Sequence, residues 1–252
     1  MHILLTNDDG WQAEGLRVLA RKLICEGHRV TVAAPDSERS AASHALTILK
    51  PLTAKPIQFE GASGWAIDGA PADCARLGLH LTKRDKPDIC ISGINHGSNL
   101  GGACIYSGTV NAAMEASMAG CPAIAASLEK SAKYDFAPAA DLTVKLIGYA
   151  LSHPIPRGQI YNLNLPARAQ IRGLFFTQIL GPDFLTEANY QEFTSDYNQK
   201  YYFLDDGANE QYFHPDSDSK RCQDGWATLS VLGWDISAKN DGKLPESGLL
   251  TL

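Results

Sequence analysis

Apolar and polar positions along the first half of the chain alternate between short strand-like runs and stretches with helical spacing. Residues 3–5 are uninterruptedly apolar, and residues 29–35 (RVTVAAP) form a second, mostly apolar segment, as expected of strands buried on both faces of a sheet. Between them, apolar residues recur at helical spacing from Leu16 to Ile24, and Gly27 follows as a stop signal. This strand–helix–strand order predicts parallel strands joined by a right-handed crossover.

The same pattern continues down the chain. Further strands are predicted at 87–92, 123–127 and 159–165, with helices beginning near Pro71 and Thr109 and another over 136–151. We expect 159–165 to be the last strand of the main sheet. The predicted fold is a Rossmann-like α/β fold, with a mostly parallel sheet flanked by helices. The first turn lacks the Gly-x-Gly-x-x-Gly fingerprint, so we expect no nicotinamide, flavin or other organic cofactor.

The character of the chain changes after the predicted core. Residues 184–234 contain more than half of the Phe, Trp and Tyr residues, and these lie among acids and amides without helical spacing. Such a pattern predicts β-ribbons, and aromatic side chains mixed with polar ones are typical of subunit contacts. We therefore expect one α/β domain over 1–252, with a core of about 1–180 and a C-terminal β-rich arm at about 183–238 used in oligomerisation.

Composition and charge narrow the classes of function. The 252 residues are 44% hydrophobic and carry a formal net charge of −6. That charge argues against binding a nucleic acid polymer or an anionic membrane, but it is compatible with a small phosphorylated substrate. The chain shows no signal peptide or membrane span, and its six cysteines are scattered without a Cys-x-x-Cys pair. We expect a soluble cytoplasmic protein with reduced thiols.

Two neighbouring carboxylates, Asp8 and Asp9, follow directly after the first strand. Gly10 permits a sharp turn there, and ligands of open α/β sheets bind beyond the carboxyl ends of the strands. Adjacent carboxylates repel each other unless a positive charge lies between them. One interpretation is therefore a divalent-cation site. The alternative is a solvated turn in which one aspartate caps the next helix.

Ser40 and Asn95 lie in loops that follow two other strands of the predicted sheet. Because parallel strands end at the same edge, these oxygen-bearing side chains can meet Asp8 and Asp9. Two carboxylates, a hydroxyl and an amide carbonyl form a hard donor set that favours Mg²⁺ or Mn²⁺ over Zn²⁺. Taken singly, Ser40 also fits an ordinary turn hydroxyl and Asn95 an Asx-turn.

The helix that begins near Ser107, Gly108 and Thr109 adds a candidate phosphate site. Free backbone N–H groups at a helix N-terminus favour an anion, and Gly108 would allow a phosphate to approach closely. Asn99, in the preceding glycine-rich loop, could donate a hydrogen bond to the same group. The alternative is a helix start that Ser107 or Thr109 merely caps.

Three further side chains lie in these loops. His44 and His96 are candidates for a general acid that protonates a leaving alkoxide, or are simply polar loop residues. Arg39 either steadies a phosphate or pairs with Asp36. The residues alone leave both questions open.

Several motifs, in this order, resemble SurE, the survival protein E family of metal-dependent nucleotidases. They are residues 5–10 (LTNDDG), 34–43 (APDSERSAAS), 69–74 (GAPADC), 92–99 (SGINHGSN), 106–110 (YSGTV), 162–166 (NLNLP) and 224–230 (DGWATLS). Each motif alone is weak, but together they cover nearly the whole chain. Ala41 is a departure, since the family commonly has Gly there.

The resemblance implies a function and a set of roles. The family hydrolyses nucleoside 5′- and 3′-monophosphates with one divalent cation per subunit, and its members form dimers or tetramers by exchanging C-terminal elements. We therefore expect a homodimer or homotetramer whose substrate is a nucleoside monophosphate. The metal ligands implied are Asp8, Asp9, Ser40 and Asn95, and the phosphate contacts implied are Asn99, Ser107, Gly108 and Thr109.

Two mechanisms remain open at this stage, because either Asp8 or Asp9 can act as the base for a metal-activated water or attack phosphorus directly. A haloacid-dehalogenase-type phosphatase is excluded, since its Asp-x-Asp pattern fails at Gly10 and Trp11. From another class, a nucleotide-sensing binding module with a degenerate site remains the rival hypothesis.

Overall fold

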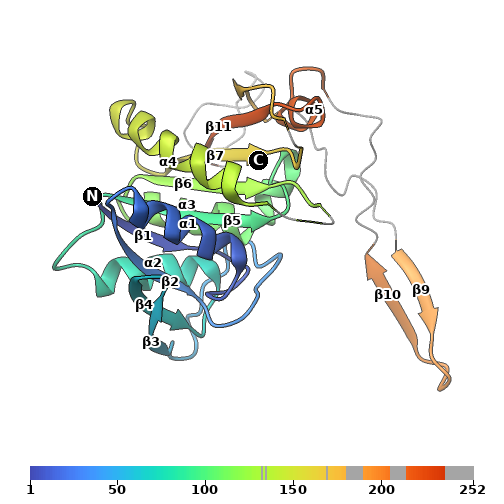
Figure 1. The fold of residues 1–252 in the computed structure, drawn as a ribbon. Helices are drawn as coiled ribbons and strands as arrows, with labels where there is room; N and C mark the ends of the chain where they lie inside the picture. The colour runs from blue at the N-terminus through green and yellow to red at the C-terminus, as the bar shows by residue number, and fades with distance from the viewer. Residues whose placement is uncertain (132, 134, 169, 180–189, 205–213, 236–252) are drawn as a thin grey trace, which may run out of the picture.

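The computed structural model describes residues 1–252 except 132, 134, 169, 180–189, 205–213 and 236–252. Its main feature is a nine-stranded sheet in the order β3-β4-β2-β1-β5-β6-β7-β11-β8 (Figure 1). The strands of this sheet are β1 (His2–Thr6), β2 (Arg29–Pro35), β3 (Ala54–Phe59), β4 (Ala62–Ile67), β5 (Ile89–His96), β6 (Ala123–Leu128), β7 (Gln159–Leu165), β8 (Leu174–Phe176) and β11 (Ala227–Gly233).

The centre of the sheet is parallel, from β4 through β2, β1, β5 and β6 to β7. Only two pairings are antiparallel, β3 with β4 and β7 with β11, and β8 runs parallel to β11. The Rossmann-like α/β fold expected from the sequence is confirmed. Because β1, β2 and β5 are parallel neighbours, the loops that follow them leave the sheet at one edge.

Helices cover both faces of the sheet (Figure 1). Helices α1 (Glu14–Cys25) and α4 (Ala137–Ser152) pack on one face, and α2 (Pro71–Leu81) and α3 (Gly108–Met118) pack on the other. A short 3₁₀ helix, η1 (Gly101–Ile105), precedes α3, and α5 (Asp218–Gln223) precedes β11. The expected helices are therefore present. Asn95, which was expected in a loop, belongs to the last part of β5.

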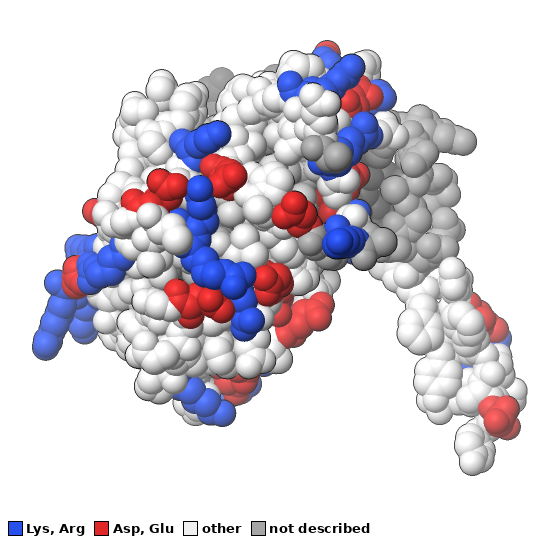
Figure 2. All heavy atoms as spheres, viewed as in Figure 1, with Lys and Arg blue, Asp and Glu red and all other residues white. Residues whose placement is uncertain are grey.

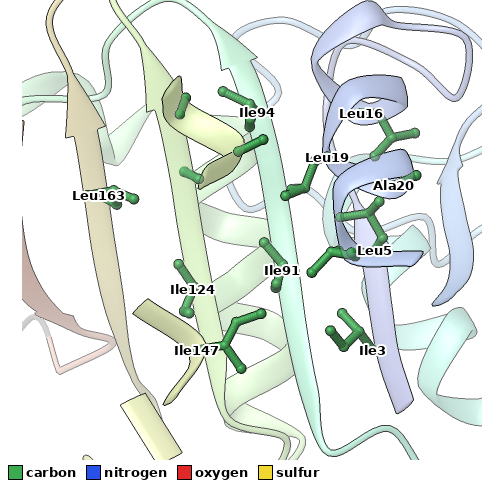
Figure 3. Close-up of a cluster of buried hydrophobic side chains, with 14 of the residues drawn as sticks. Ile3, Leu5, Leu16, Leu19, Ala20, Ile91, Ile94, Ile124, Ile147 and Leu163 are labelled. Atoms are coloured by element: carbon green, nitrogen blue, oxygen red, sulfur yellow. The ribbon is translucent and has the colours of Figure 1, made fainter. Parts of the chain in front are cut away.

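The two cores explain why β1 carries no polar alternation. Ile3 and Leu5 face the α1–α4 side, where they join Leu16 and Ile91 (Figure 3). Leu4 points the opposite way into the cluster under α2 and α3. All of these side chains are fully buried. The middle of a strand buried on both faces gains hydrophobic stabilisation at every position, so residues 3–5 are all apolar and the polar residues of β1 are at its two ends.

The sheet does not end at β7, and that expectation was wrong. Residues 227–233 form β11, which continues the main sheet beside β7, and β8 lies beyond it. The physical reason is that β11 and β7 pair across a long stretch of sequence, which local pattern cannot reveal. The β3–β4 hairpin at the other edge was also not predicted, because its strands mix exposed and buried positions.

The ribbon expected in the aromatic-rich segment is present. Strands β9 (Tyr190–Thr194) and β10 (Lys200–Leu204) form an antiparallel hairpin that lies away from the sheet in Figure 1. Every residue of both strands is exposed, and Phe193 meets Phe203 edge to face. The use of this arm in oligomerisation stays a prediction. Parts of the predicted arm, 183–189 and 205–213 with its end at 236–238, lie outside the described residues.

Two further expectations concern cysteines and membranes. All six cysteines are free thiols, and only Cys25 is exposed. Within the part of the chain that the structure describes, no helix combines the length and the apolar character needed to cross a membrane.

Candidate functional site

The turn after β1 turns both aspartates away from the strand. The buried Asn7 closes this turn, donating from its Nδ2 to the Gly10 carbonyl at 2.9 Å. Gly10 has a φ of +97°, and a Cβ there would lie 3.2 Å from the Ser37 backbone. The next helix, α1, is capped at Ala13 without a side-chain hydrogen bond. The alternative in which Asp8 or Asp9 caps that helix is therefore wrong.

Asp8 is buried against the N-terminus of α3. The Thr109 hydroxyl donates a hydrogen bond to Asp8 Oδ1. Gly108 is needed for this contact, because a Cβ at that position would lie 2.7 Å from the Asp8 Cβ and 2.9 Å from its Oδ2. The close approach that Gly108 allows is thus filled by the Asp8 side chain, where the sequence had suggested a phosphate.

Asp9 lies beside Asp8 and is also largely buried. The His96 backbone N–H donates to Asp9 Oδ2 at 3.2 Å. Burial raises the pKa of Asp8 to about 6, opposed by the Thr109 hydrogen bond and reinforced by the charge of Asp9. Burial likewise raises the pKa of Asp9 to about 6, opposed by the His96 N–H and reinforced by the charge of Glu38. The site therefore holds more negative charge than its surroundings stabilise.

The two aspartates line a cavity of about 480 Å³ at this edge of the sheet. Five other residues named from the sequence line the same cavity: Ser40, Asn95, His96, Asn99 and Ser107. The structure therefore brings together loops that follow β1, β2 and β5 with the start of α3. That these side chains bind a cation and a phosphate stays a prediction.

The oxygen donors fit a hard cation. Asn95 donates from Nδ2 to the Gly97 carbonyl at 2.8 Å, which leaves its carbonyl oxygen as the acceptor of the amide. Ser40 donates to Glu38 Oε1 at 2.6 Å and keeps its lone pairs. Among the described residues, no three His, Cys, Asp or Glu side chains lie close enough to share one ion. A cation here would therefore need oxygen from Asn95, Ser40 or water besides the carboxylates.

The loop that carries Ser40 is fastened at both ends. The Arg39 N–H donates to the Asp8 carbonyl at 2.8 Å, and the Ser43 N–H donates to the Tyr106 carbonyl at 3.0 Å. The guanidinium of Arg39 pairs with Asp36 and Asp68 and does not line the cavity. Of its two alternatives, the structure therefore favours pairing with Asp36.

The two candidate histidines differ. His44 Nε2 lies 2.9 Å from Glu115 Oε2, so this ring holds the loop to α3 and does not line the cavity. His96 does line it, with its ring 5.0 Å from the ring of Phe136. Burial lowers the pKa of His96. A neutral imidazole at neutral pH is a weaker proton donor than an imidazolium, so a general-acid role for His96 stays an open prediction.

At the start of α3, Ser107 is the N-cap, and its hydroxyl accepts a hydrogen bond from the Val110 N–H at 3.0 Å. The Thr109 hydroxyl donates to Asp8, and the Thr109 backbone N–H also lies against that carboxylate. Gly108 and Thr109 are buried behind Ser107 and do not themselves line the cavity. Asn99 is buried, and its Nδ2 donates to Ser127 Oγ at 2.8 Å.

Several residues that line the cavity were not identified as site residues from the sequence, among them Glu38, Tyr106 and Lys130. Lys130 is the single Lys or Arg among the described residues that line the cavity. It follows β6, whose carboxyl end lies at the same edge as those of β1 and β5. The topological rule that identified Asn95 would therefore also have identified Lys130.

The chain is similar to known proteins over most of its length. The family model described as survival protein SurE matches residues 3–184. The 5′-nucleotidase SurE of Gloeobacter violaceus is 40% identical over 94% of this chain and 91% of its own length. That of Myxococcus xanthus is 38% identical over 97% and 91%. The crystal structure of the SurE protein from Aquifex aeolicus superposes with a TM-score of 0.81 at 30% identity, covering 94% of this chain and 95% of that one.

Replacing Gly108 with Ala should displace Asp8, because the added Cβ overlaps the Asp8 side chain. We expect a stability loss of about 1–3 kcal/mol, measured by urea unfolding, and Mn²⁺ binding weakened by at least ~10-fold. Gly148→Ala in α4 is the matched control, since its Cβ would meet no atom within 4 Å. That variant should gain up to about 1 kcal/mol. Equal effects of the two substitutions would contradict the packing described.

Replacing Asp9 with Asn should stabilise the metal-free protein at neutral pH. The pKa of Asp9 is about 6 when folded and near 3.8 when unfolded, so the folded chain holds this proton more tightly. The contribution of Asp9 to the free energy of unfolding of the wild type is therefore fully present below the unfolded pKa and is lost as pH rises through the folded pKa. Asn cannot ionise and avoids this loss.

In EDTA, the free energy of unfolding of Asp9→Asn minus that of the wild type should therefore increase by about 2 kcal/mol between about pH 4 and pH 7.5. If the difference in unfolding free energy between the two proteins did not change with pH, the raised pKa of Asp9 in the folded protein would be contradicted.

Proposed function

Because this chain belongs to the SurE family, we propose that it is a metal-dependent phosphomonoesterase that hydrolyses nucleoside 5′-monophosphates to nucleoside and phosphate. Hydrolysis of 3′-monophosphates is part of the same proposal. One observation carries it: a buried pair of carboxylates and the start of a helix share one cavity. The carboxylates attract a cation and the helix start attracts an anion. A metal-dependent phosphomonoesterase needs both, because it binds a metal ion beside the phosphate group of its substrate.

We assign one divalent cation per subunit, Mg²⁺ or Mn²⁺, to the cavity, without an organic cofactor. Asp8 and Asp9 would hold it through their carboxylates, and Asn95 and Ser40 through their neutral oxygens. When bound, such a cation supplies Lewis-acid neutralisation of the charge that develops at phosphorus. Its positive charge would also favour the ionised form of both aspartates, whose pKa values are raised mainly by burial.

The phosphate would lie against the start of α3. The first-turn N–H groups of a helix lack intrahelical partners, so that of Gly108 can donate to a phosphate oxygen. Thr109 is assigned to the phosphate by the family resemblance, and without substrate its hydroxyl and N–H face Asp8. Asn99 and Ser107 line the same wall and can add side-chain donors. Binding of the phosphate to this wall would hold the scissile bond in a fixed orientation toward Asp9. Such orientation lowers the entropic part of the reaction barrier.

Two roles remain for the carboxylates in the chemical step. Either one aspartate accepts a proton from the attacking water, or one attacks phosphorus itself. His96 lies within the cavity, where its ring N–H could donate to the departing oxygen. Its Nδ1 is 4.0 Å from Asp9 Oδ1, so the charge of Asp9 influences the imidazole ring.

Lys130 is the residue we add to this site. Three carboxylates (Asp8, Asp9 and Glu38) line the cavity, and a dianionic phosphate must enter it. A lysine on the wall would offset part of that repulsion by a charge-assisted hydrogen bond to the substrate.

Partners and location complete the proposal. Figure 2 shows Lys and Arg interspersed with Asp and Glu over the visible face, without one broad basic area on it. This supports a small nucleotide as the substrate and argues against a nucleic acid polymer or a membrane as partner. The exposed aromatic hairpin β9–β10 supports assembly into a homodimer or homotetramer. We also propose a cytoplasmic location.

Purified protein should release phosphate from AMP or GMP when Mn²⁺ is present and should stop when EDTA is added. Asp9→Asn should lower kcat at least ~1,000-fold, because it removes a ligand and a base or nucleophile. A malachite-green assay for phosphate measures both. Tight nucleotide binding without any phosphate release would instead support the binding-module hypothesis.

Replacing Lys130 with Gln should raise the KM for AMP about 10-fold, equivalent to ~1.4 kcal/mol, because the substrate loses a charged partner. Lys133→Gln is the matched control, since Lys133 lines a neighbouring pocket and not this cavity. Initial-rate kinetics separate KM from kcat. If both variants behave like the wild type, Lys130 does not contact the substrate.

A further inference from the structure

The backbone of Asn99 is held by a side chain from another strand. Its N–H donates to Asn164 Oδ1 at 2.7 Å, and its carbonyl accepts from Asn164 Nδ2 at 3.0 Å. One amide side chain thus pairs with both polar groups of one backbone residue, as a neighbouring strand would. This matters because residues 97–100 have neither helical nor strand structure of their own.

Neighbouring side chains make further hydrogen bonds to Asn99. Asn162 Nδ2 donates to the same carbonyl at 3.0 Å, and the Cys104 thiol lies 3.2 Å from it. Ser127 Oγ accepts from the Asn99 side chain. Ser127, Asn162 and Asn164 are at most 1% exposed, so no solvent competes for these hydrogen bonds.

The placement of these residues in the sheet is informative. Asn162 and Asn164 alternate on the face of β7 where Ile160 joins the apolar cluster under α3. Ser127 on β6 is directly opposite Asn164. Polar side chains at such positions are costly unless they are hydrogen-bonded, and among the described residues Asn162 Oδ1 has no partner. The register of β6 and β7 places Asn164 and Ser127 side by side next to Asn99. Asn164 hydrogen-bonds the Asn99 backbone, and Ser127 hydrogen-bonds the Asn99 side chain.

A second anchor lies two residues further along the loop. Both carboxylate oxygens of Asp218 on α5 lie 3.2 Å from the Gly101 N–H, and Asp218 is 1% exposed. Between these two anchors the loop has little freedom. The segment that leads into β11 thereby contacts the region that follows the cavity loop.

We propose that Asn164 is a positioning residue for substrate binding, which acts with Asn162, Ser127 and Asp218 to hold Asn99 in the cavity wall. The proposal rests on the proposed function, in which Asn99 contacts the phosphate. Asn164 does not itself line the cavity, so it acts through Asn99 alone. The bound cation is held by other loops and should not depend on it.

The test compares Asn164→Leu with Thr228→Val. Thr228 is directly opposite Asn164 on β11, is 1% exposed, and among the described residues its hydroxyl has no hydrogen-bond partner. Asn164→Leu should raise the KM for AMP at least ~10-fold and leave the Mn²⁺ Kd, measured by electron paramagnetic resonance without nucleotide, within about twofold. Thr228→Val should leave both values within about twofold.

A double-mutant cycle with Asn99→Ala separates positioning from general destabilisation. If Asn164 acts through Asn99, the double variant should bind AMP no more weakly than Asn99→Ala alone. Effects on KM that multiply, or a normal KM in Asn164→Leu, would overturn the proposal. Should Asn164→Leu fail to fold, Asn164→Thr suits a strand, loses one of the two hydrogen bonds and is expected to act in the same direction.

A readout independent of turnover distinguishes this inference from the proposed function. Amide hydrogen exchange of Asn99 should be at least ~10-fold faster in the Asn164 variant than in Thr228→Val. If the wild type does not hydrolyse nucleotides yet the amide is protected by Asn164, the proposed function fails and the anchoring stands. If exchange is equal in the two variants, the anchoring fails whatever the activity.

Discussion

The structure around the candidate site depends on the burial of two adjacent carboxylates at the end of β1. Removing each charge from water is costly, and the two repel each other. The chain offsets only part of this cost, with the Thr109 hydroxyl on Asp8 and the His96 N–H on Asp9. Both pKa values therefore remain near 6. Because the protein does not balance the buried negative charge of this site, binding a cation stabilises it. This links the fold to the proposed chemistry.

Much of the local structure follows from holding that pair in place. Asn7 and Gly10 form a turn that keeps both side chains at the sheet edge. Gly108 leaves room for Asp8 against α3, so the cation site and the helix N-terminus share one wall. The loop with Ser40 is fastened to the Asp8 carbonyl through Arg39. Because the parallel strands end together, each of these segments needs only a short loop to reach the cavity.

The sequence was sufficient for features set by local pattern and by sheet topology. Short, mostly apolar runs identified β1 and β2, and the rule that parallel strands end at one edge predicted that Asp8, Asp9, Ser40 and Asn95 lie together, as they do in one cavity. Ser107 was recognised as a possible cap from its residue type. Features set by long-range pairing could not be predicted in this way. The place of β11 beside β7 and the grip of Asn164 on Asn99 depend on contacts between distant segments.

Residue type was also a poor guide where a side chain had two partners to choose from. Arg39 pairs with acids outside the cavity, and His44 turns to Glu115, because each finds a carboxylate close by. Gly108 was identified from the sequence as a phosphate contact, which stays a prediction, and the structure adds that it leaves space for the Asp8 side chain. Such choices are decided by packing, which the sequence specifies only through the complete fold.

The central claim is that oxygen atoms from Asp8, Asp9 and their neighbours converge on one divalent cation. Anomalous diffraction from crystals soaked in Mn²⁺ tests it most directly. The account predicts a single strong peak about 2.0–2.4 Å from carboxylate oxygens of both aspartates, within reach of Asn95 or Ser40 directly or through water. A fully occupied Mn²⁺ bound elsewhere, with the aspartates free of metal at the same concentration, would contradict it.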